Sequence, residues 1–220
     1  EMLANERTKS ILCAAFALGI GAVAPAHADD VFITPDIPFV EFDNGNEYIL
    51  IERNQDPEAR IPDFFTKTSR QCPPFCIQPM SGGEGVTTVG ELEVLAFMEG
   101  AVAEGTGFLI DARLTDWYNK GTIPGSISLP FNVFENPNSN PFLVPVLELM
   151  GGVRDDAGKW EFSDPKELMM FCNGPWCGQS HRAIANLLSV GYPGEKIYYY
   201  RGGMQGWLTL GLTVHFPAES

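Results

Sequence analysis

The chain has 220 residues and carries 28 acidic against 14 basic side chains, which gives a net charge of −14. This acidity argues against nucleic acid and anionic membrane surfaces as partners. With 45% apolar and 11% aromatic residues, the composition excludes a fully disordered chain, and the length suits one well-buried domain with an appendage.

The first 28 residues have the three parts of a secretory leader. Arg7 and Lys9 form a basic start, residues 11–23 are apolar, and Ala26-His27-Ala28 is a cleavage site of small residues. The apolar run is shorter than the roughly 20 residues that a membrane-spanning helix needs. The sequence therefore predicts export to the periplasm with cleavage of the leader, and a retained membrane anchor is the alternative.

Residues 29–85 predict a small β-rich and irregular N-terminal extension. Val31–Ile33, Phe39–Phe42 and Tyr48–Ile51 are short strand-like runs. Asn44-Gly45 between the last two is typical of a hairpin turn. Several prolines then keep the chain irregular up to the end of this extension.

Residues 86–220 alternate helical and extended patterns. Thr87 or Thr88 is placed to cap a helix that reaches Glu99, and a short buried strand at residues 107–110 ends at Asp111. Further predicted elements are strands at 127–129 and 197–200 and helices at 142–150 and 204–210. This alternation predicts a three-layer α/β/α sandwich around a central parallel sheet.

The stretch from residue 166 to residue 191 carries the strongest functional signal. Leu168–Phe171 is continuously apolar, as in a strand covered on both faces, and apolar residues recur at helical spacing from Ala183 until Gly191. Cys172 opens the loop between these two elements. Unpaired N–H groups and the helix dipole stabilise a thiolate at such a place. We therefore expect Cys172 to have a depressed pKa and to act as a nucleophile, provided that its sulfur faces these amides and is reachable from solvent.

Four motifs, in this order, resemble the successive signatures of a rhodanese-like domain. They are Phe108–Arg113, Tyr118–Pro130, Met170–Cys172 and Tyr200–Trp207, and the likeness covers roughly residues 85–215. The resemblance implies the same α/β/α sandwich and a cysteine that takes sulfane sulfur from a small anionic donor as a persulfide. The persulfide sulfur then passes to a thiol or another thiophilic acceptor. Cys172 matches the family nucleophile, and the resemblance implies no metal and no organic cofactor.

The loop after Cys172 departs from the family pattern. A typical member has an arginine five residues after the cysteine, where this chain has Cys177, and Arg182 comes later in the chain. The loop is also about two residues longer than in ordinary sulfurtransferases, and longer loops in this superfamily are associated with phosphatases. Cys177 begins a Cys-x4-Arg run of its own, but it lies beyond the strand end, so Cys172 is the preferred nucleophile.

Several groups near this loop are candidates for binding an anionic substrate. Arg113 and Asp111 lie at the carboxyl end of a strand, so Arg113 either attracts an anion or forms a structural contact with Asp111. Trp176 either walls the site or packs at the surface, and Ser180 either donates to an anion or caps the helix. The other candidates are Asn173, Gly174, Cys177, Gly178, Gln179 and Arg182.

The four cysteines after the leader fall into two close pairs. For Cys72 and Cys76 a local disulfide is the leading interpretation, and a redox or sulfur relay to Cys172 and a four-cysteine zinc site are alternatives. Cys177 either fills space in the loop or acts as a resolving thiol that closes a disulfide with Cys172.

The sequence thus predicts an exported sulfurtransferase of one rhodanese-like domain that carries sulfur on Cys172. One alternative is a thiol-disulfide or phosphatase-type enzyme that uses Cys172 and Cys177. Another is an inactive accessory subunit attached to a membrane complex through residues 1–28 or the N-terminal extension. A redox partner protein is a further candidate partner.

Overall fold

The computed structural model describes residues 30–136 and 139–217, so the predicted leader lies outside the described residues. The chain from Val31 onward belongs to one compact unit. Within the described ranges, no helix combines the length and the apolar character needed to cross a bilayer.

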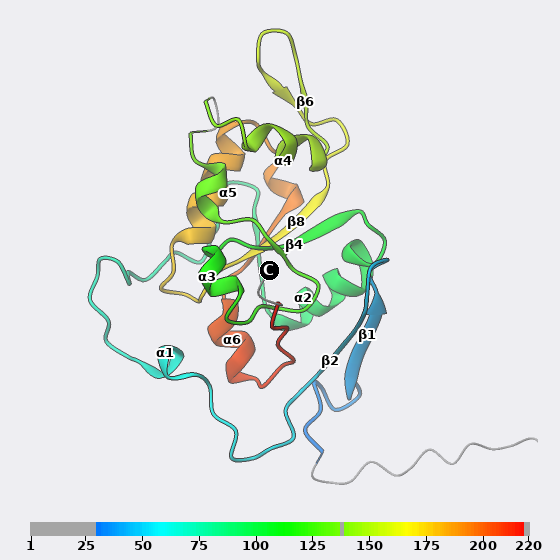
Figure 1. Cartoon of the computed structure of the whole chain (residues 1–220), viewed down its shortest axis with the longest axis vertical. Coiled ribbons are helices and arrows are strands. Elements are labelled where there is room, and N and C mark those ends of the chain that lie inside the picture. The colour runs from blue at the N-terminus through cyan, green and yellow to red at the C-terminus, as the bar shows by residue number, and fades with distance from the viewer. Residues whose placement is uncertain (1–29, 137–138, 218–220) are drawn as a thin grey trace, which may run out of the picture. The chain divides into compact units, whose positions relative to one another are not determined.

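A parallel five-stranded sheet forms the middle of this unit (Figure 1). In spatial order its strands are β3 (Thr87–Val89), β9 (Ile197–Tyr200), β8 (Glu167–Phe171), β4 (Gly107–Asp111) and β5 (Ile127–Ser128). All four pairings are parallel, and Phe171 of β8 stands level with Asp111 and Tyr200. The carboxyl ends of β4, β8 and β9 therefore meet at one edge of the sheet, as predicted.

The central strand β8 sends its side chains alternately into two hydrophobic cores. Leu168 and Met170 belong to one core, and Met169 and Phe171 belong to the other. Successive residues of a strand point to opposite faces, and each of these four side chains is almost fully buried. The unbroken apolar run in the sequence thus reflects a strand that is covered on both sides, as predicted.

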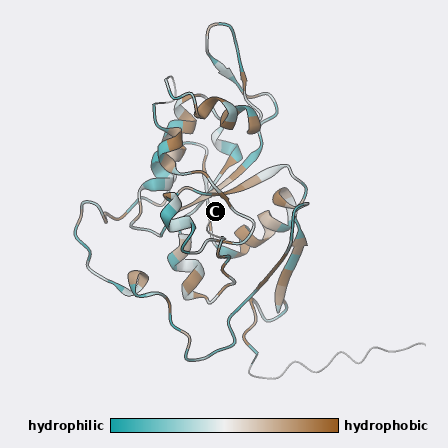
Figure 2. Ribbon diagram, viewed as in Figure 1, coloured by the Kyte–Doolittle hydropathy of each residue, from teal (hydrophilic) through white to brown (hydrophobic). Residues whose placement is uncertain are grey.

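Helices cover both faces of the sheet, which confirms the three-layer sandwich. On the Leu168 face lie α4 (Leu143–Leu149) and α5 (Gln179–Ser189). On the opposite face lie α2 (Glu91–Phe97), the π-helical turn Met98–Val102 and α6 (Gly203–Thr209). The ribbon of these helices carries both brown and teal residues in Figure 2, as expected where one helix face is buried.

Short elements connect these layers. They are α1 (Asp63–Thr66), α3 (Thr115–Tyr118) and the 3-10 turns Phe131–Phe134 and Gly194–Lys196.

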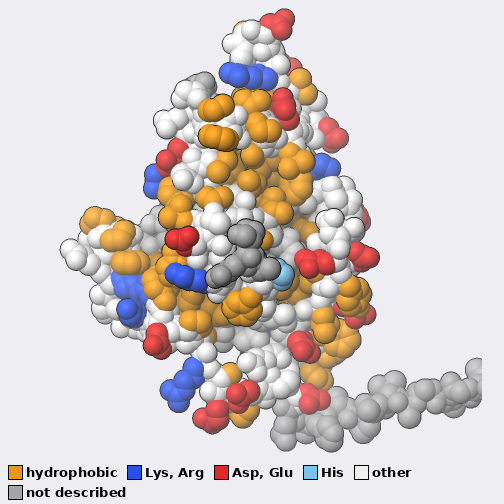
Figure 3. All heavy atoms as spheres, in the orientation of Figure 1, with side chains coloured by type: hydrophobic (Ala, Val, Ile, Leu, Met, Phe, Trp, Pro, Cys, Tyr) orange, Lys and Arg blue, Asp and Glu red, His pale blue; other side chains and the backbone are white. Residues whose placement is uncertain are grey.

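Phe142 and Leu149 remain largely exposed at the two ends of α4, and Figure 3 shows hydrophobic side chains gathered over this helix.

The predicted hairpin of the N-terminal extension is confirmed. β1 (Phe39–Asp43) pairs antiparallel with β2 (Tyr48–Glu52), and Gly45 in the turn has a φ of +84°, which favours glycine. The inward side chains of the hairpin join the core that contains α2. The extension therefore shares a core with the sheet.

The strand predicted at Val31–Ile33 is wrong, since the chain there makes only a tight turn with a bridge between Thr34 and Ile37.

One further expectation is corrected. Thr87 and Thr88 lie in the edge strand β3, where β-branched residues pack well, and α2 begins after Gly90. The N–H of Gly90 donates to the Glu93 carboxylate at 3.0 Å, so a glutamate of the first turn closes this helix end. The connection after α4 also contains a small hairpin, β6 (Val153–Arg154) and β7 (Trp160–Glu161).

Candidate functional site

Cys172 lies where the central strand ends and the loop to α5 begins. The loop turns back on itself, because the Cys177 N–H donates to the Gly174 carbonyl at 2.9 Å. Two backbone bonds hold the start of the loop against α6: Met204 donates to the Cys172 carbonyl and Gln205 donates to the Asn173 carbonyl, each at 3.0 Å. The strand, loop and helix order that the sequence predicted is confirmed.

Polar groups surround the Cys172 sulfur. Its Sγ lies 3.1 Å from the Ser180 hydroxyl and 3.0 Å from the Cys177 carbonyl oxygen, which accepts from the protonated thiol. Burial alone raises the pKa of Cys172. Hydrogen bonds from the Cys177 thiol, the Ser180 hydroxyl and the N–H groups of Ser180 and Gly174 outweigh burial and lower this pKa from 9.0 to about 7. Cys172 therefore ionises more readily than an ordinary cysteine, and the N–H groups of Gly174 and Ser180 contribute to this.

Cys177 is the partner that stays protonated. Its hydrogen bond to Cys172, followed by burial, raises the pKa of the Cys177 thiol. Its Sγ also lies 3.5 Å from Oε1 of Gln179. Cys172 therefore ionises before Cys177, and this order favours Cys172 over Cys177 as the nucleophile.

Asp111 and Arg113 form a buried ion pair behind the loop. The Arg113 guanidinium donates to both oxygens of Asp111, with Nη2 at 2.6 Å from Oδ2, and to the Gly121 carbonyl at 2.7 Å. Thr122 adds a hydroxyl bond to Asp111 at 2.8 Å. Only 1% of Arg113 is exposed. Its Nη1 also lies 3.4 Å from Oδ1 of Asn173, so Arg113 anchors the start of the loop. The structure thus gives Arg113 the structural contact that was one of its two predicted roles.

Two predicted roles on α5 are corrected. Arg182 pairs with Glu135 and stacks over Phe131, so its guanidinium is engaged away from the loop. The helix begins at Gln179 after Gly178, so Ser180 lies inside the first turn and does not cap it. Its hydroxyl is directed instead at the Cys172 sulfur.

Residues 62–80, called here the covering segment, lie over the loop. The Gln78 N–H donates to the Pro175 carbonyl at 2.8 Å, and Arg201 donates to the Gln78 carbonyl at 3.0 Å. The Arg70 guanidinium lies 4.4 Å from the Trp176 ring and also stacks on Phe64 and Phe75. Trp176 is thus a wall shared by the loop and the covering segment.

The sequence did not reveal the covering segment. Its contacts join residues that are about 100 positions apart, and no local pattern specifies such pairing. The sequence signal that could have indicated this segment is a cationic side chain, Arg70, between the aromatic residues Phe64 and Phe75.

Both thiols of the loop are buried. Cys172 is 1% exposed and Cys177 is 7% exposed. This burial is at odds with the sequence-based requirement that the Cys172 sulfur be reachable from solvent. Chemistry at Cys172 therefore requires the structure around the loop to open.

Cys72 and Cys76 are joined by a disulfide within the covering segment, which confirms the leading interpretation of this pair. The four-cysteine zinc alternative is wrong, because sulfurs in a disulfide are not thiolate ligands. Cys172 and Cys177 are both free thiols.

Gly203 allows the loop and α6 to pack closely. Its φ is +55°, and a Cβ atom there would lie 2.7 Å from the Gly174 nitrogen. A side chain at this position would therefore push the loop that follows Cys172.

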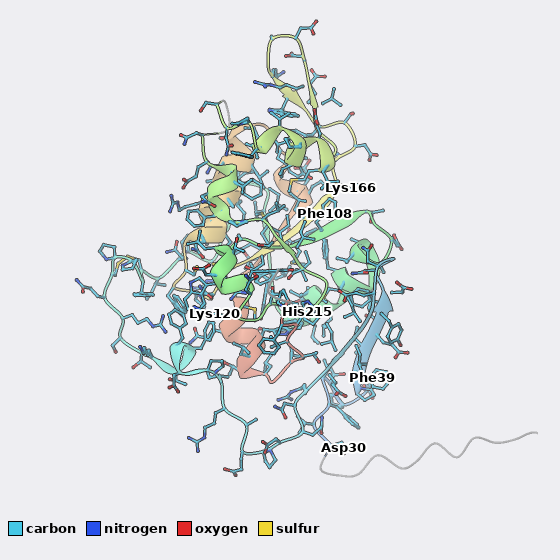
Figure 4. The ribbon with its side chains drawn as sticks, viewed as in Figure 1. Asp30, Phe39, Phe108, Lys120, Lys166 and His215 are labelled. Atoms are coloured by element: carbon cyan, nitrogen blue, oxygen red, sulfur yellow. A yellow bond between two sulfur atoms is a disulfide. The ribbon has the colours of Figure 1, made fainter. Side chains whose placement is uncertain are left out.

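A mostly apolar cavity of about 330 Å³ lies beside the loop, on the side of Arg113 and Met204. Phe64, Trp117 and Lys120 also line it. Figure 4 shows Lys120 and His215 on neighbouring segments, which join where the Thr122 N–H donates to the His215 carbonyl at 2.9 Å.

The rhodanese-like domain family matches residues 93–210, which is more than half of the chain. No curated protein matches.

Three solved structures illustrate the similarity. A human single-domain sulfurtransferase is 25% identical, with 56% of this chain and 95% of that chain covered and a TM-score of 0.36. A thiosulfate sulfurtransferase from Pseudomonas aeruginosa is 24% identical, with 61% and 22% covered and a TM-score of 0.42. A protein of unknown function from Rhodopseudomonas palustris, titled a possible tyrosine phosphatase, is 17% identical, with 61% and 88% covered and a TM-score of 0.43. On the family match, this chain belongs to the rhodanese-like domain family.

Proposed function

We propose that this protein is a sulfurtransferase that carries sulfane sulfur as a persulfide on Cys172. The observation that carries this proposal is the placement of the Cys172 sulfur at the carboxyl end of β8. There the N–H groups of Gly174 and Ser180 and two side-chain donors hold its pKa at about 7. The family match supports the same class of chemistry.

The first step is a nucleophilic displacement. With thiosulfate as the donor, the Cys172 thiolate attacks the outer sulfur, and the bond between the two sulfurs of thiosulfate breaks. Sulfite leaves with the electron pair of that bond, and a persulfide anion remains on Cys172. The loop amides and the Ser180 hydroxyl, which stabilise the thiolate, also face the charge of the persulfide.

A phosphatase mechanism receives less support from the same site. Phosphate-transferring cysteine enzymes need a cation to hold the substrate's equatorial oxygens, and arginine suits this task because it binds them bidentately. Arg113 is held by Asp111 and Gly121, and Arg182 is held by Glu135. The position five residues after the nucleophile holds the neutral thiol of Cys177.

We further propose that the protein works in an oxidising compartment such as the periplasm. The disulfide between Cys72 and Cys76 supports this location, because such bonds persist outside the reducing cytosol. Separation of periplasmic and cytosolic fractions of a native host tests it, and recovery in the cytosol with free Cys72 would refute it.

The sulfite released in the first step tests the proposed activity directly. On mixing the whole chain with excess thiosulfate and no acceptor, we expect a burst of one equivalent of sulfite per chain. Cys172→Ser should give none, and Cys177→Ser should retain the burst. Absence of the burst in the wild-type protein, over times long enough for the site to open, would refute the proposal and favour the accessory role.

A further inference from the structure

The loop holds a second nucleophile within reach of the first. We infer that Cys177 resolves the Cys172 persulfide by forming a disulfide with Cys172 and releasing hydrogen sulfide, and that a dithiol reductant then restores the pair. This inference rests on the proposed function, and it assigns to that site a resolving residue and a class of partner.

The backbone brings the two thiols together. The turn closed by the Cys177 N–H and the Gly174 carbonyl returns Cys177 towards the strand end, where its own carbonyl lies 3.0 Å from the Cys172 sulfur. The Cys177 sulfur lies 3.5 Å from Oε1 of Gln179, in the same first helical turn whose Ser180 hydroxyl lies 3.1 Å from the Cys172 sulfur, so both thiols face this turn. A thiol held in this way has a high effective concentration at the Cys172 sulfur, so its attack is faster than that of a thiol from solution.

Burial makes Cys177 the thiol best placed to act. Cys172 is 1% exposed, so an external acceptor must wait for the site to open. Cys177 is already inside the site and needs no opening. The remaining cysteines of the described chain, Cys72 and Cys76, are tied up in their disulfide.

The resolving step balances without an added oxidant. The Cys177 sulfur attacks Sγ of Cys172, a bond forms between the two cysteine sulfurs, and the bond from Cys172 to the sulfane sulfur breaks. The sulfane sulfur leaves as HS⁻, with the proton that the Cys177 thiol gives up. The sulfane sulfur is thereby reduced by two electrons, and each cysteine sulfur is oxidised by one. The disulfide that forms must be reduced before a second turnover.

The exposure of the two sulfurs favours a dithiol reductant that attacks Cys177. Cys177 is the more exposed of the pair, and attack there expels Cys172 as the leaving thiolate. A thiol with a low pKa leaves more readily, and the pKa of Cys172 is about 7. A dithiol completes the reduction by closing its own disulfide, whereas a monothiol would remain attached to Cys177.

The test is an anaerobic single turnover with thiosulfate and no added thiol, with sulfite and sulfide both measured. For the wild-type chain we expect one equivalent of each, and a peptide containing linked Cys172 and Cys177 after alkylation and digestion without reduction. Cys177→Ser and Cys177→Ala should release sulfite but not sulfide, and each should gain the mass of one sulfur. Their sulfite release also shows that the variant loop is folded.

The possible outcomes separate the two proposals. Two results would overturn the resolving role and leave the sulfurtransferase proposal standing. One is sulfite without sulfide from the wild-type chain, and the other is as much sulfide from both Cys177 variants as from the wild-type chain. No sulfite from any of the three proteins would overturn the sulfurtransferase proposal itself. Dithiothreitol, added after the turnover, should restore a second sulfite burst in the wild-type chain, and a failure to do so would contradict the reductant step.

Discussion

The Ser180 hydroxyl is expected to set a large part of the acidity of Cys172. Its oxygen lies 3.1 Å from the Cys172 sulfur inside a fully buried site. A hydrogen bond to a charged group is worth about 1.5–3 kcal/mol, and one pKa unit corresponds to about 1.4 kcal/mol. Ser180→Ala should therefore raise the pKa of Cys172 by about one to two units, because loss of a donor destabilises the thiolate and not the thiol.

The titration of thiolate ultraviolet absorbance measures this shift without requiring access to the site. Subtraction of the Cys172→Ser spectrum isolates the Cys172 signal. We expect a wild-type midpoint near pH 7 and a Ser180→Ala midpoint near 8 to 9, with less thiolate at every lower pH. Ser189→Ala is the matched control, because this exposed serine of the same helix bonds only to the Asn186 carbonyl. An unchanged or lowered midpoint in Ser180→Ala would refute the reasoning.

Three other predictions concern the groups that hold and cover the loop. Asp111→Asn leaves a buried arginine without its charge partner, so chemical denaturation should show a loss of about 3–5 kcal/mol, whereas exposed Asp116→Asn should change stability little; equal effects would contradict a structural role. Arg70→Ala removes stacking on Trp176 worth about 1.4 kcal/mol, which should make opening of the site about tenfold more favourable. Alkylation of Cys172 should therefore become roughly tenfold faster, whereas the exposed control Arg60→Ala should leave its rate unchanged. The initial sulfite burst should also slow as pH falls through about 7, since the Cys172 thiolate is then protonated, and a pH-independent rate would show that opening limits the reaction.

The sheet and its helices could be predicted because their signals are local. Leu168–Phe171 is apolar at every position since both faces of β8 are covered, and the helical spacing after it stops at Gly191. The role of Cys172 as the candidate nucleophile could then be predicted from its position between these two elements. The alternative roles of Arg113 could not be separated from the sequence, because Asp111 and the Gly121 carbonyl meet it only in the folded state.

Other parts of the site depend on contacts that no short stretch encodes. Arg182 looked like a loop residue, but one turn into α5 its side chain points to Glu135. Ser180 was ambiguous because a serine near a helix start either donates to a bound anion or caps the helix, and the helix start at Gln179 excludes the capping role. The covering segment depends on pairs such as Gln78 with Pro175, and the burial of Cys172 is opposite to what the sequence-based hypothesis required.

The most direct measurement of the central claim is the intact mass of Cys177→Ser after thiosulfate, compared with the Cys172→Ser/Cys177→Ser double variant. The single variant cannot resolve a persulfide through Cys177, so it should gain the mass of one sulfur, and cyanide should remove it as thiocyanate. The double variant should gain nothing. An unchanged mass in the single variant, or an equal gain in both, would contradict sulfur transfer at Cys172.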